Sequence, residues 1–234
     1  MRDFIVKILV KLGLYKNAVS IINYFKAKSQ ARTIKRYGIE TLREADAALT
    51  EVGHQMFLIF GTLLGAVREH GFIPFDYDLD VGIVADGPSD EIHSAMKKHG
   101  LKLTRTTYIR TEKGEWVTEE TYHYKGVGID LYFFFEDGSE WYAFGPKHHE
   151  YKDWKEANAT DGFPTVRAYV PQCKFERQDF MGVQVYMPIE ADAWCRALYT
   201  ENYMIPIKNW DPKKHQTSST RYKWTGERCY RRDY

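Results

Sequence analysis

Residues 57–84 read FLIFGTLLGAVREHGFIPFDYDLDVGIV, and most of the inferences below rest on this stretch. After a turn at Ile73-Pro74, three carboxylates alternate with other residues: Asp76, Asp78 and Asp80. Successive side chains of a strand point to opposite faces, so this spacing places all three carboxylates on one face. Like charges gathered on one face repel one another, and Mg²⁺ prefers carboxylate oxygens as ligands. The alternative is a solvated edge strand that carries acidic residues.

The beginning of the stretch favours the metal site. An apolar run at 57–60 predicts a strand, and Gly61-Thr62 break it before a helical segment at 63–70. A Gly-Thr turn between a strand and a helix brings backbone N–H groups and a hydroxyl to a phosphate. Arg68, further along this helix, has a planar guanidinium that suits the same phosphates, although it could also be a surface arginine without a specific contact. We therefore predict that Gly61, Thr62 and Arg68 bind the phosphates of a donor substrate.

A fourth carboxylate lies in another apolar stretch. Asp130 is flanked by Ile129 and Leu131 within an expected strand at 127–135. A carboxylate in such a strand is costly to bury unless it is hydrogen-bonded, paired or bound to a metal. The residues alone leave two interpretations open, a carboxylate bonded to backbone N–H groups and a metal ligand.

The string GTLLGAVREHGFIPFDYDLDVGI, residues 61–83, resembles the signature of the LicD family, which includes the fukutin-related proteins. It departs from that signature at Phe75, where tryptophan is usual, and at Tyr77, where many members have aspartate. The resemblance implies an α+β chain with the nucleotidyltransferase fold, a polymerase-β-like palm in which helices flank a mixed sheet. It also implies that Asp78, Asp80 and Asp130 are catalytic. Two Mg²⁺ or Mn²⁺ ions would be held by Asp76, Asp78, Asp80 and Asp130, and whether Asp76 is a direct ligand stays open.

The resemblance further implies a function. The protein would move phosphocholine or a similar phospho-alcohol from a CDP-linked donor to a hydroxyl of a cell-surface glycan, such as a capsule or lipopolysaccharide, or of its lipid-linked precursor. CMP would be released. Two alternatives stay open: a nucleotidyltransferase that transfers a nucleoside monophosphate to a small molecule, and a catalytically silent glycan-binding protein at the membrane surface.

The charge distribution argues against a nucleic-acid substrate. The net charge of the 234 residues is +1, but residues 1–36 carry +8 and residues 208–234 carry +5, which leaves −12 between them. A nucleic-acid polymer needs a basic stripe along the protein body, and an acidic body lacks one. We predict a basic amphipathic helical segment at 1–36 and a single catalytic domain at 37–234 that ends in a basic aromatic tail.

The location of the protein follows from the same composition. No apolar run is long enough to span a membrane, and the lysines within the first residues do not fit a signal peptide. Three widely spaced cysteines suit reduced thiols in a cytosol. We expect a cytoplasmic protein, either free or at the inner face of the cytoplasmic membrane. There the basic segment would contact anionic lipid, or it would dock on the domain with its lysines in water.

Hydrophobic periodicity predicts the remaining elements. Helices are expected at 39–52, 89–99 and 189–199, and two short amphipathic helices within 3–28. Strands are expected at 101–109, 115–124 and 140–144, with a further two within 166–187.

Overall fold

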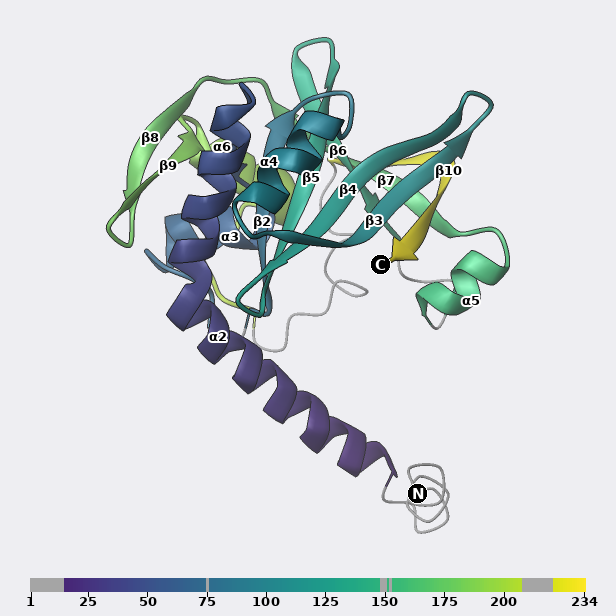
Figure 1. Cartoon of the computed structure of the whole chain (residues 1–234), viewed down its shortest axis with the longest axis horizontal. Helices are drawn as coiled ribbons and strands as arrows, with labels where there is room; N and C mark the ends of the chain where they lie inside the picture. The colour runs from purple at the N-terminus through teal and green to yellow at the C-terminus, as the bar shows by residue number, and fades with distance from the viewer. Residues whose placement is uncertain (1–14, 75, 148–150, 152, 208–220) are drawn as a thin grey trace.

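A computed structural model describes residues 15–74, 76–147, 151, 153–207 and 221–234. Its elements, drawn in Figure 1, run in the order α2 (Tyr15–Glu51), β1 (Phe57–Leu58), α3 (Phe60–Arg68), β2 (Asp78–Val84), α4 (Asp90–Lys98), β3 (Lys102–Thr111), β4 (Gly114–Tyr124), β5 (Val127–Asp137), β6 (Glu140–Pro146), α5 (Trp154–Ala159), β7 (Phe163–Pro171), β8 (Phe175–Phe180), β9 (Val183–Pro188), α6 (Ala191–Tyr199) and β10 (Tyr222–Asp233).

The described strands form one sheet in the order β4-β3-β10-β7-β6-β5-β2-β1-β9-β8. Strand β4 also pairs with β5, so β4, β3, β10, β7, β6 and β5 close into a barrel-like ring. Of the pairings between described strands, β2–β5 and β1–β9 are parallel and the others are antiparallel. Strands β2, β1, β9 and β8 extend from the ring at β5.

This topology shows that the expected polymerase-β-like palm is wrong. The palm was to be a mixed sheet flanked by helices, whereas the sheet is mostly antiparallel, curls into a ring and is accompanied by few helices. The α+β class is only partly consistent with it. The local order of strand, helix and carboxylate strand is as expected at 57–84. That local order does not specify which distant strands pair, because pairing depends on contacts far apart in the sequence.

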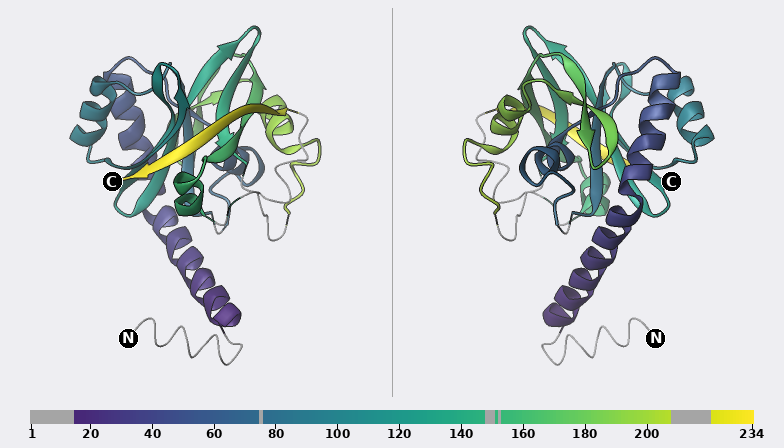
Figure 2. Two further views of the ribbon diagram at one scale, coloured as in Figure 1. Left: turned by 90° about the vertical axis from the view of Figure 1, so that its right-hand side faces the viewer. Right: turned by 90° about the vertical axis from the view of Figure 1, so that its left-hand side faces the viewer.

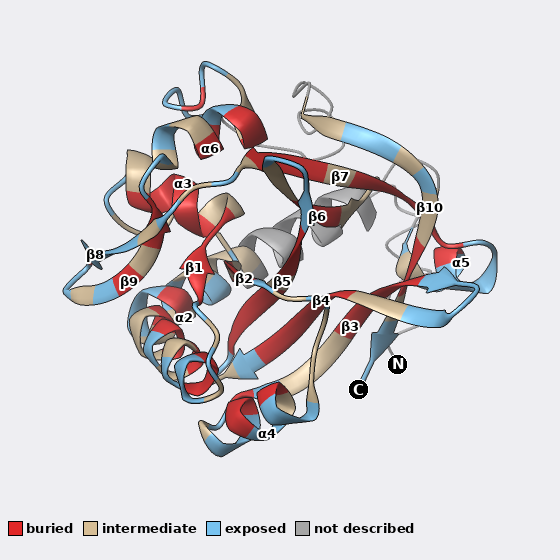
Figure 3. Ribbon diagram, turned by 90° about the horizontal axis from the view of Figure 1, so that it is seen from above, coloured by how far each residue is buried: buried red, intermediate tan, exposed pale blue. Residues whose placement is uncertain are grey.

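One face of β2 and β5 packs against helices. Its side chains are fully apolar and buried: Leu79, Val81, Ile83, Ile129, Leu131 and Phe133. Helix α2 supplies Leu42, Ala45 and Leu49 to the same core, and α4 supplies Ile92 and Met96. Figure 3 shows α2 and α4 side by side. We call this surface of the sheet the helix face. Because side chains alternate along a strand, Asp78, Asp80 and Asp130 project from the opposite face.

Helix α2 is longer than expected. A helix was predicted at 39–52, and the structure has a single helix that continues back to Tyr15. It therefore passes through the boundary expected between residues 36 and 37. In both views of Figure 2 its N-terminal part projects away from the rest of the molecule. The two short helices expected within 3–28 are replaced by this helix from residue 15 onward, and residues 1–14 lie outside the described part.

The C-terminal residues have a structural position that the sequence analysis missed. Residues 222–233, expected within a basic aromatic tail, form strand β10 between β3 and β7. Cys229 and Tyr230 of this strand are buried. The strand completes the ring, so it belongs to the sheet. Among the described helices, none has both the length and the apolar character that spanning a bilayer requires.

A close approach at Gly65 positions the segment that leads to the carboxylates. A Cβ atom on this α3 residue would lie 2.5 Å from the carbonyl oxygen of Gly71 and 3.2 Å from the backbone nitrogen of Ile73. Only a residue without a side chain fits there, since backbone atoms cannot move aside as a side chain does.

We predict that Gly65→Ala destabilises the protein by about 1–3 kcal/mol, as overpacking does, despite the better helix propensity of alanine. Thermal unfolding should show a melting temperature lower by several degrees. Gly71→Ala is the matched control, because its Cβ would meet only the Met181 sulfur at an ordinary 3.5 Å. Equal melting temperatures for the two variants would contradict the prediction.

Candidate active site

Four carboxylates meet where β2 runs parallel to β5. Asp78 and Asp80 share one face of β2, as their spacing predicted, and Asp76 lies just before the strand. Asp80 and Asp130 are partners in the β2–β5 register. Because paired residues of neighbouring strands point to the same side, the Asp130 side chain joins those of Asp78 and Asp80. We call this side of the sheet, opposite to the helix face, the carboxylate face.

The first turn of α3 and the residue before it, Ile59, hold Asp80 at three points. Gly61 and Thr62 were expected to precede the helix, whereas they lie within its first turn. The Gly61 N–H donates to Asp80 Oδ2 at 3.0 Å, and the Asp80 N–H donates to Thr62 Oγ1 at 2.8 Å. The Asp80 carbonyl oxygen accepts from the Ile59 N–H at 3.3 Å. Gly61 and Thr62 therefore lie beside the carboxylates. Their described bonds go to Asp80, so their contact with a donor phosphate stays a prediction.

Gly61 also shows how close two of the carboxylates are. A Cβ on Gly61 would lie 3.0 Å from Oδ2 of Asp76 and 3.0 Å from Oδ2 of Asp80. Both carboxylates thus converge on the same small space, which exists only because residue 61 has no side chain. The closeness of its carboxylate to Gly61 and Asp80 places Asp76 at the site, although Asp76 does not lie in a strand.

Strand β4 contributes two residues that the sequence analysis did not identify. Thr121 is the partner of Asp130 in the β4–β5 register, and its hydroxyl donates to Asp130 Oδ1 at 2.5 Å. Glu119, two residues earlier on the same face, is buried. The alternation of Glu119 and Thr121 in a predicted strand was a signal that they share a face. A further signal was Lys125-Gly126, which forms the two-residue turn of the β4–β5 hairpin and so sets Thr121 opposite Asp130.

The carboxylates are destabilised by burial and by one another. Burial raises the pKa of Asp76 to about 6. Burial, followed by the charges of Asp130, Asp76 and Glu119, raises the pKa of Asp78 to about 8. Burial and the charge of Asp130 likewise raise the pKa of Glu119 to about 8. The pKa values of Asp80 and Asp130 are raised mainly by burial as well. Such a cluster favours a bound cation.

The donor set suits a hard divalent cation. No three His, Cys, Asp or Glu side chains of the described residues are arranged as a ready-made metal site. Mg²⁺, however, is commonly bound by one or two carboxylates and completes its coordination with water and substrate phosphates. The carboxylate oxygens of Asp76, Asp78, Asp80 and Asp130 match that chemistry. Among the described residues, the positively charged side chains near them are too few to neutralise all four carboxylates. Metal binding by these residues stays a prediction.

Arg68 is held elsewhere in the structure. Its Nε donates to Glu69 Oε1 at 2.8 Å, and its Nη1 donates to the Tyr203 carbonyl oxygen at 3.1 Å. These bonds tie the end of α3 to the segment after α6. The described contacts of Arg68 do not include the carboxylates, and its contact with a donor phosphate stays a prediction.

Tyr132 borders the carboxylates. It follows Asp130 on the same face of β5, and its ring packs edge-on against Phe60 with centroids 4.8 Å apart. Burial raises the pKa of its hydroxyl, and the charges of Glu119 and Asp80 raise it further. The hydroxyl is therefore a neutral hydrogen-bonding group beside the carboxylates.

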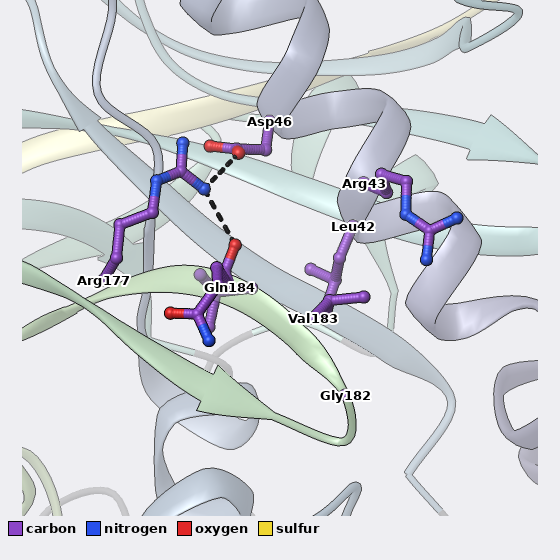
Figure 4. Close-up of a pocket in the computed structure, with 8 residues that line it drawn as sticks. Leu42, Arg43, Asp46, Arg177, Gly182, Val183 and Gln184 are labelled. Atoms are coloured by element: carbon purple, nitrogen blue, oxygen red, sulfur yellow. Dashed lines mark hydrogen bonds and ion pairs between the residues drawn. The ribbon is translucent and has the colours of Figure 1, made fainter.

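A separate hollow lies between α2 and the β8–β9 hairpin. Its volume is about 320 Å³, and Leu42, Arg43 and Val183 contribute to its lining. In Figure 4 the Arg177 guanidinium bridges this hollow, donating to Asp46 Oδ2 at 2.7 Å and to the Gln184 carbonyl oxygen at 2.8 Å. None of the carboxylates of β2 and β5 lines it. The bonds of Arg177 join a helix to a hairpin, which is a structural role.

We predict that Asp78→Asn stabilises the metal-free protein at neutral to alkaline pH. The pKa of Asp78 is raised to about 8 from an ordinary 3.8, so its ionisation opposes folding. This destabilisation is absent below the pKa that Asp78 has in the unfolded chain, and it grows as the pH rises from about 4 to about 8. With a chelator present, the variant should melt at a higher temperature than the parent near pH 8 and at an equal temperature near pH 4.

The matched control is Glu176→Gln at an exposed carboxylate of β8, which should leave the melting temperature unchanged at both pH values. If Asp78→Asn lowered the melting temperature near pH 8, the carboxylate would be stabilising, and the repulsion described above would be excluded.

Comparison with known proteins assigns the family. The family described as LicD/FKTN/FKRP, nucleotidyltransferase domain, matches residues 53–190, which include Gly61, Thr62, Glu119 and the four aspartates of the site. Ribitol-5-phosphate transferase FKTN of Mus musculus is 27% identical over 184 residues, covering 78% of this chain and 36% of its own length.

The Homo sapiens protein of the same name is 26% identical over 186 residues, covering 79% of this chain and 37% of its own length. An uncharacterised protein of Rickettsia typhi is 41% identical over 69 residues, covering 26% of this chain and 21% of its own length. The chain thus spans little more than a third of the length of the FKTN proteins. The resemblance noted in residues 61–83 is confirmed, and the chain belongs to the LicD/FKTN/FKRP family.

Proposed function

We propose that this protein transfers a phospho-alcohol, such as ribitol phosphate or phosphocholine, from a CDP-linked donor to a glycan hydroxyl and releases CMP. The observation that carries the proposal is the convergence of Asp76, Asp78, Asp80 and Asp130 beside Gly61 and Thr62 at the start of α3. The name of the FKTN relatives, ribitol-5-phosphate transferase, supports the class of group transferred. The acceptor is a cell-surface glycan or its lipid-linked precursor.

The carboxylates would hold one or two divalent cations, Mg²⁺ or Mn²⁺. When bound, such ions neutralise charge on the phosphate oxygens and so favour attack at phosphorus. Asp78 and Asp80 are the principal ligands in this proposal, with Asp130 and Asp76 beside them. The bonds from Gly61 and Thr62 keep Asp80 in one orientation, which preorganises the site before substrate binds.

Asp130 is the candidate to receive the proton of the acceptor hydroxyl. Its Oδ1 is occupied by the Thr121 hydroxyl, which leaves Oδ2 to accept a proton. In the transfer, the acceptor oxygen bonds to the phosphorus of the phospho-alcohol, and the bond from that phosphorus to the oxygen of CMP breaks. The acceptor proton passes to Asp130 Oδ2, and CMP leaves with the electron pair of the broken bond.

A donor panel tests the reaction. We expect CMP to be released from CDP-ribitol, CDP-choline or CDP-glycerol in the presence of Mg²⁺ and a glycan acceptor. A chelator should abolish this release. Asp80→Asn keeps an oxygen for the Gly61 N–H but loses the charge, so turnover should fall at least roughly a hundredfold. Asp179→Asn at an exposed position of β8 is the control. Pyrophosphate release from ATP or CTP would instead favour transfer of a nucleoside monophosphate.

The basic N-terminal segment is proposed to contact anionic lipid, where a lipid-linked acceptor would be found. Residues 1–36 carry a net charge of +8, and α2 projects from the body of the molecule (Figure 2). Each lysine or arginine near an anionic surface contributes about 1 kcal/mol, and salt screens this attraction.

We therefore expect the full chain to co-sediment with anionic vesicles and to be released as the salt concentration rises. Changing Lys7, Lys11 and Lys16 to glutamine should weaken this binding, while zwitterionic vesicles should bind neither protein. Binding that is equal for both proteins and insensitive to salt would exclude an electrostatic contact through this segment.

A further inference from the structure

The carboxylate face continues beyond β5 across β4, β3 and β10. The strand registers align two transverse rows of partners on this face. The first row consists of Asp80, Asp130, Thr121, Arg105 and Asp233, and the second of Gly82, Tyr132, Glu119, Thr107 and Arg231. Paired residues of neighbouring strands share a face. Asp80, Asp130 and Glu119 thus lie on β2, β5 and β4, whereas the two arginines lie on the next strands, β3 and β10, together with Asp233.

The arginines lie within electrostatic reach of the carboxylates. Burial raises the pKa of Asp130, whereas the Thr121 hydrogen bond and the charges of Arg105 and Arg231 act to lower it. For Glu119, burial and Asp130 raise the pKa, and the same two arginines oppose that rise. The charge of Arg105 also opposes the raised pKa of Asp78. The site therefore has an acidic side and a basic side.

The carboxylate of Asp233 lies within ion-pair distance of both guanidinium groups. Arg231 Nε donates to Asp233 Oδ1 at 3.0 Å, and Arg105 Nε lies 3.6 Å from the same oxygen. Arg105 Nε is buried and has no hydrogen-bond partner among the described residues. The Asp233 side chain is 71% exposed, so water weakens its pairing with both arginines. Two neighbouring cations with one exposed counter-charge provide donors for a further anion.

We infer that Arg105 and Arg231 form a phosphate-binding subsite that faces the carboxylates across the site. The inference rests on the proposed function and names the residues that would hold a substrate phosphate from the side opposite to Asp78, Asp80 and Asp130. Guanidinium groups suit this role because their planar arrangement of donors matches phosphate oxygens. The phosphate belongs either to the diphosphate of the donor or to a phosphorylated acceptor. The competing explanation is that the arginines only neutralise Glu119 and Asp130.

Calorimetric titration with inorganic pyrophosphate in the presence of Mg²⁺ tests this subsite in the full chain. Arg105→Gln and Arg231→Gln should each weaken pyrophosphate binding roughly tenfold to a hundredfold, the usual effect of losing a charged hydrogen bond. Titration with Mg²⁺ alone should show equal or tighter binding, because each variant removes a positive charge near the carboxylates. This opposite response of anion and cation would not arise from a general loss of structure.

Arg232→Gln is the matched control. Arg232 follows Arg231 in β10 but points to the other face, where it donates to Glu115 at 2.8 and 2.9 Å. Its replacement should leave pyrophosphate binding unchanged. Asp233→Asn is a second variant at an exposed residue, and it should strengthen pyrophosphate binding because it removes the carboxylate that competes for both arginines. Melting temperatures of all variants verify that they are folded.

Two further ligands distinguish the source of the phosphate. Weaker binding of CDP to the arginine variants would place the donor diphosphate there, whereas weaker binding of ribitol 5-phosphate alone would place a phosphorylated acceptor there. The inference is overturned if the folded arginine variants bind all three anions as the parent does, or if Asp233→Asn weakens binding as they do. Arginine-dependent anion binding without CMP release from any donor would support the subsite and count against the proposed function.

Discussion

The parallel pairing of β2 with β5 is the constraint on which the site depends. It sets Asp80 beside Asp130 on one face, while their neighbours Leu79, Val81, Ile129 and Leu131 fill the core on the other. The apolar neighbours make the register costly to shift, since a slip of one residue would expose them and bury the carboxylates among helices. The hydrophobic core therefore fixes the positions of the charges that repel one another.

The elements around this pair serve to hold it. The first turn of α3 bonds to Asp80 through Gly61 and Thr62, and β4 bonds to Asp130 through Thr121. A hydrogen bond between buried groups contributes little net stability, but it sets the orientation of a side chain. Each of the two central carboxylates is thus oriented by a different neighbouring element. Such support allows a site to be arranged before any ligand binds.

The concentration of charge has opposite consequences for stability and for the proposed activity. Burial raises the pKa values of Asp76, Asp78 and Glu119, and repulsion from neighbouring carboxylates adds to it for Asp78 and Glu119, so their ionisation weakens the fold near neutral pH. The same property would make a bound cation strongly stabilising. Arg105 and Arg231 offset part of the repulsion from across the face, and as proposed they would also hold a phosphate. Functional sites commonly retain such local destabilisation because the chemistry requires it.

The sequence alone determined the local features. Alternation with a period of two placed Asp78 and Asp80 on one face, the apolar flanks of Asp130 identified it as a buried carboxylate, and residues 61–83 indicated the family. These are properties of short segments, in which side-chain direction follows from backbone geometry. Only the tertiary structure decided that the sheet closes into a ring rather than a palm, that β10 belongs to it, and that Glu119, Arg105 and Arg231 join the site. Glu119 joins the site through the register of the β4–β5 hairpin. The ring, the place of β10 and the positions of the two arginines depend on which distant strands pair, and that pairing is set by the packing of the whole chain, which no single segment encodes.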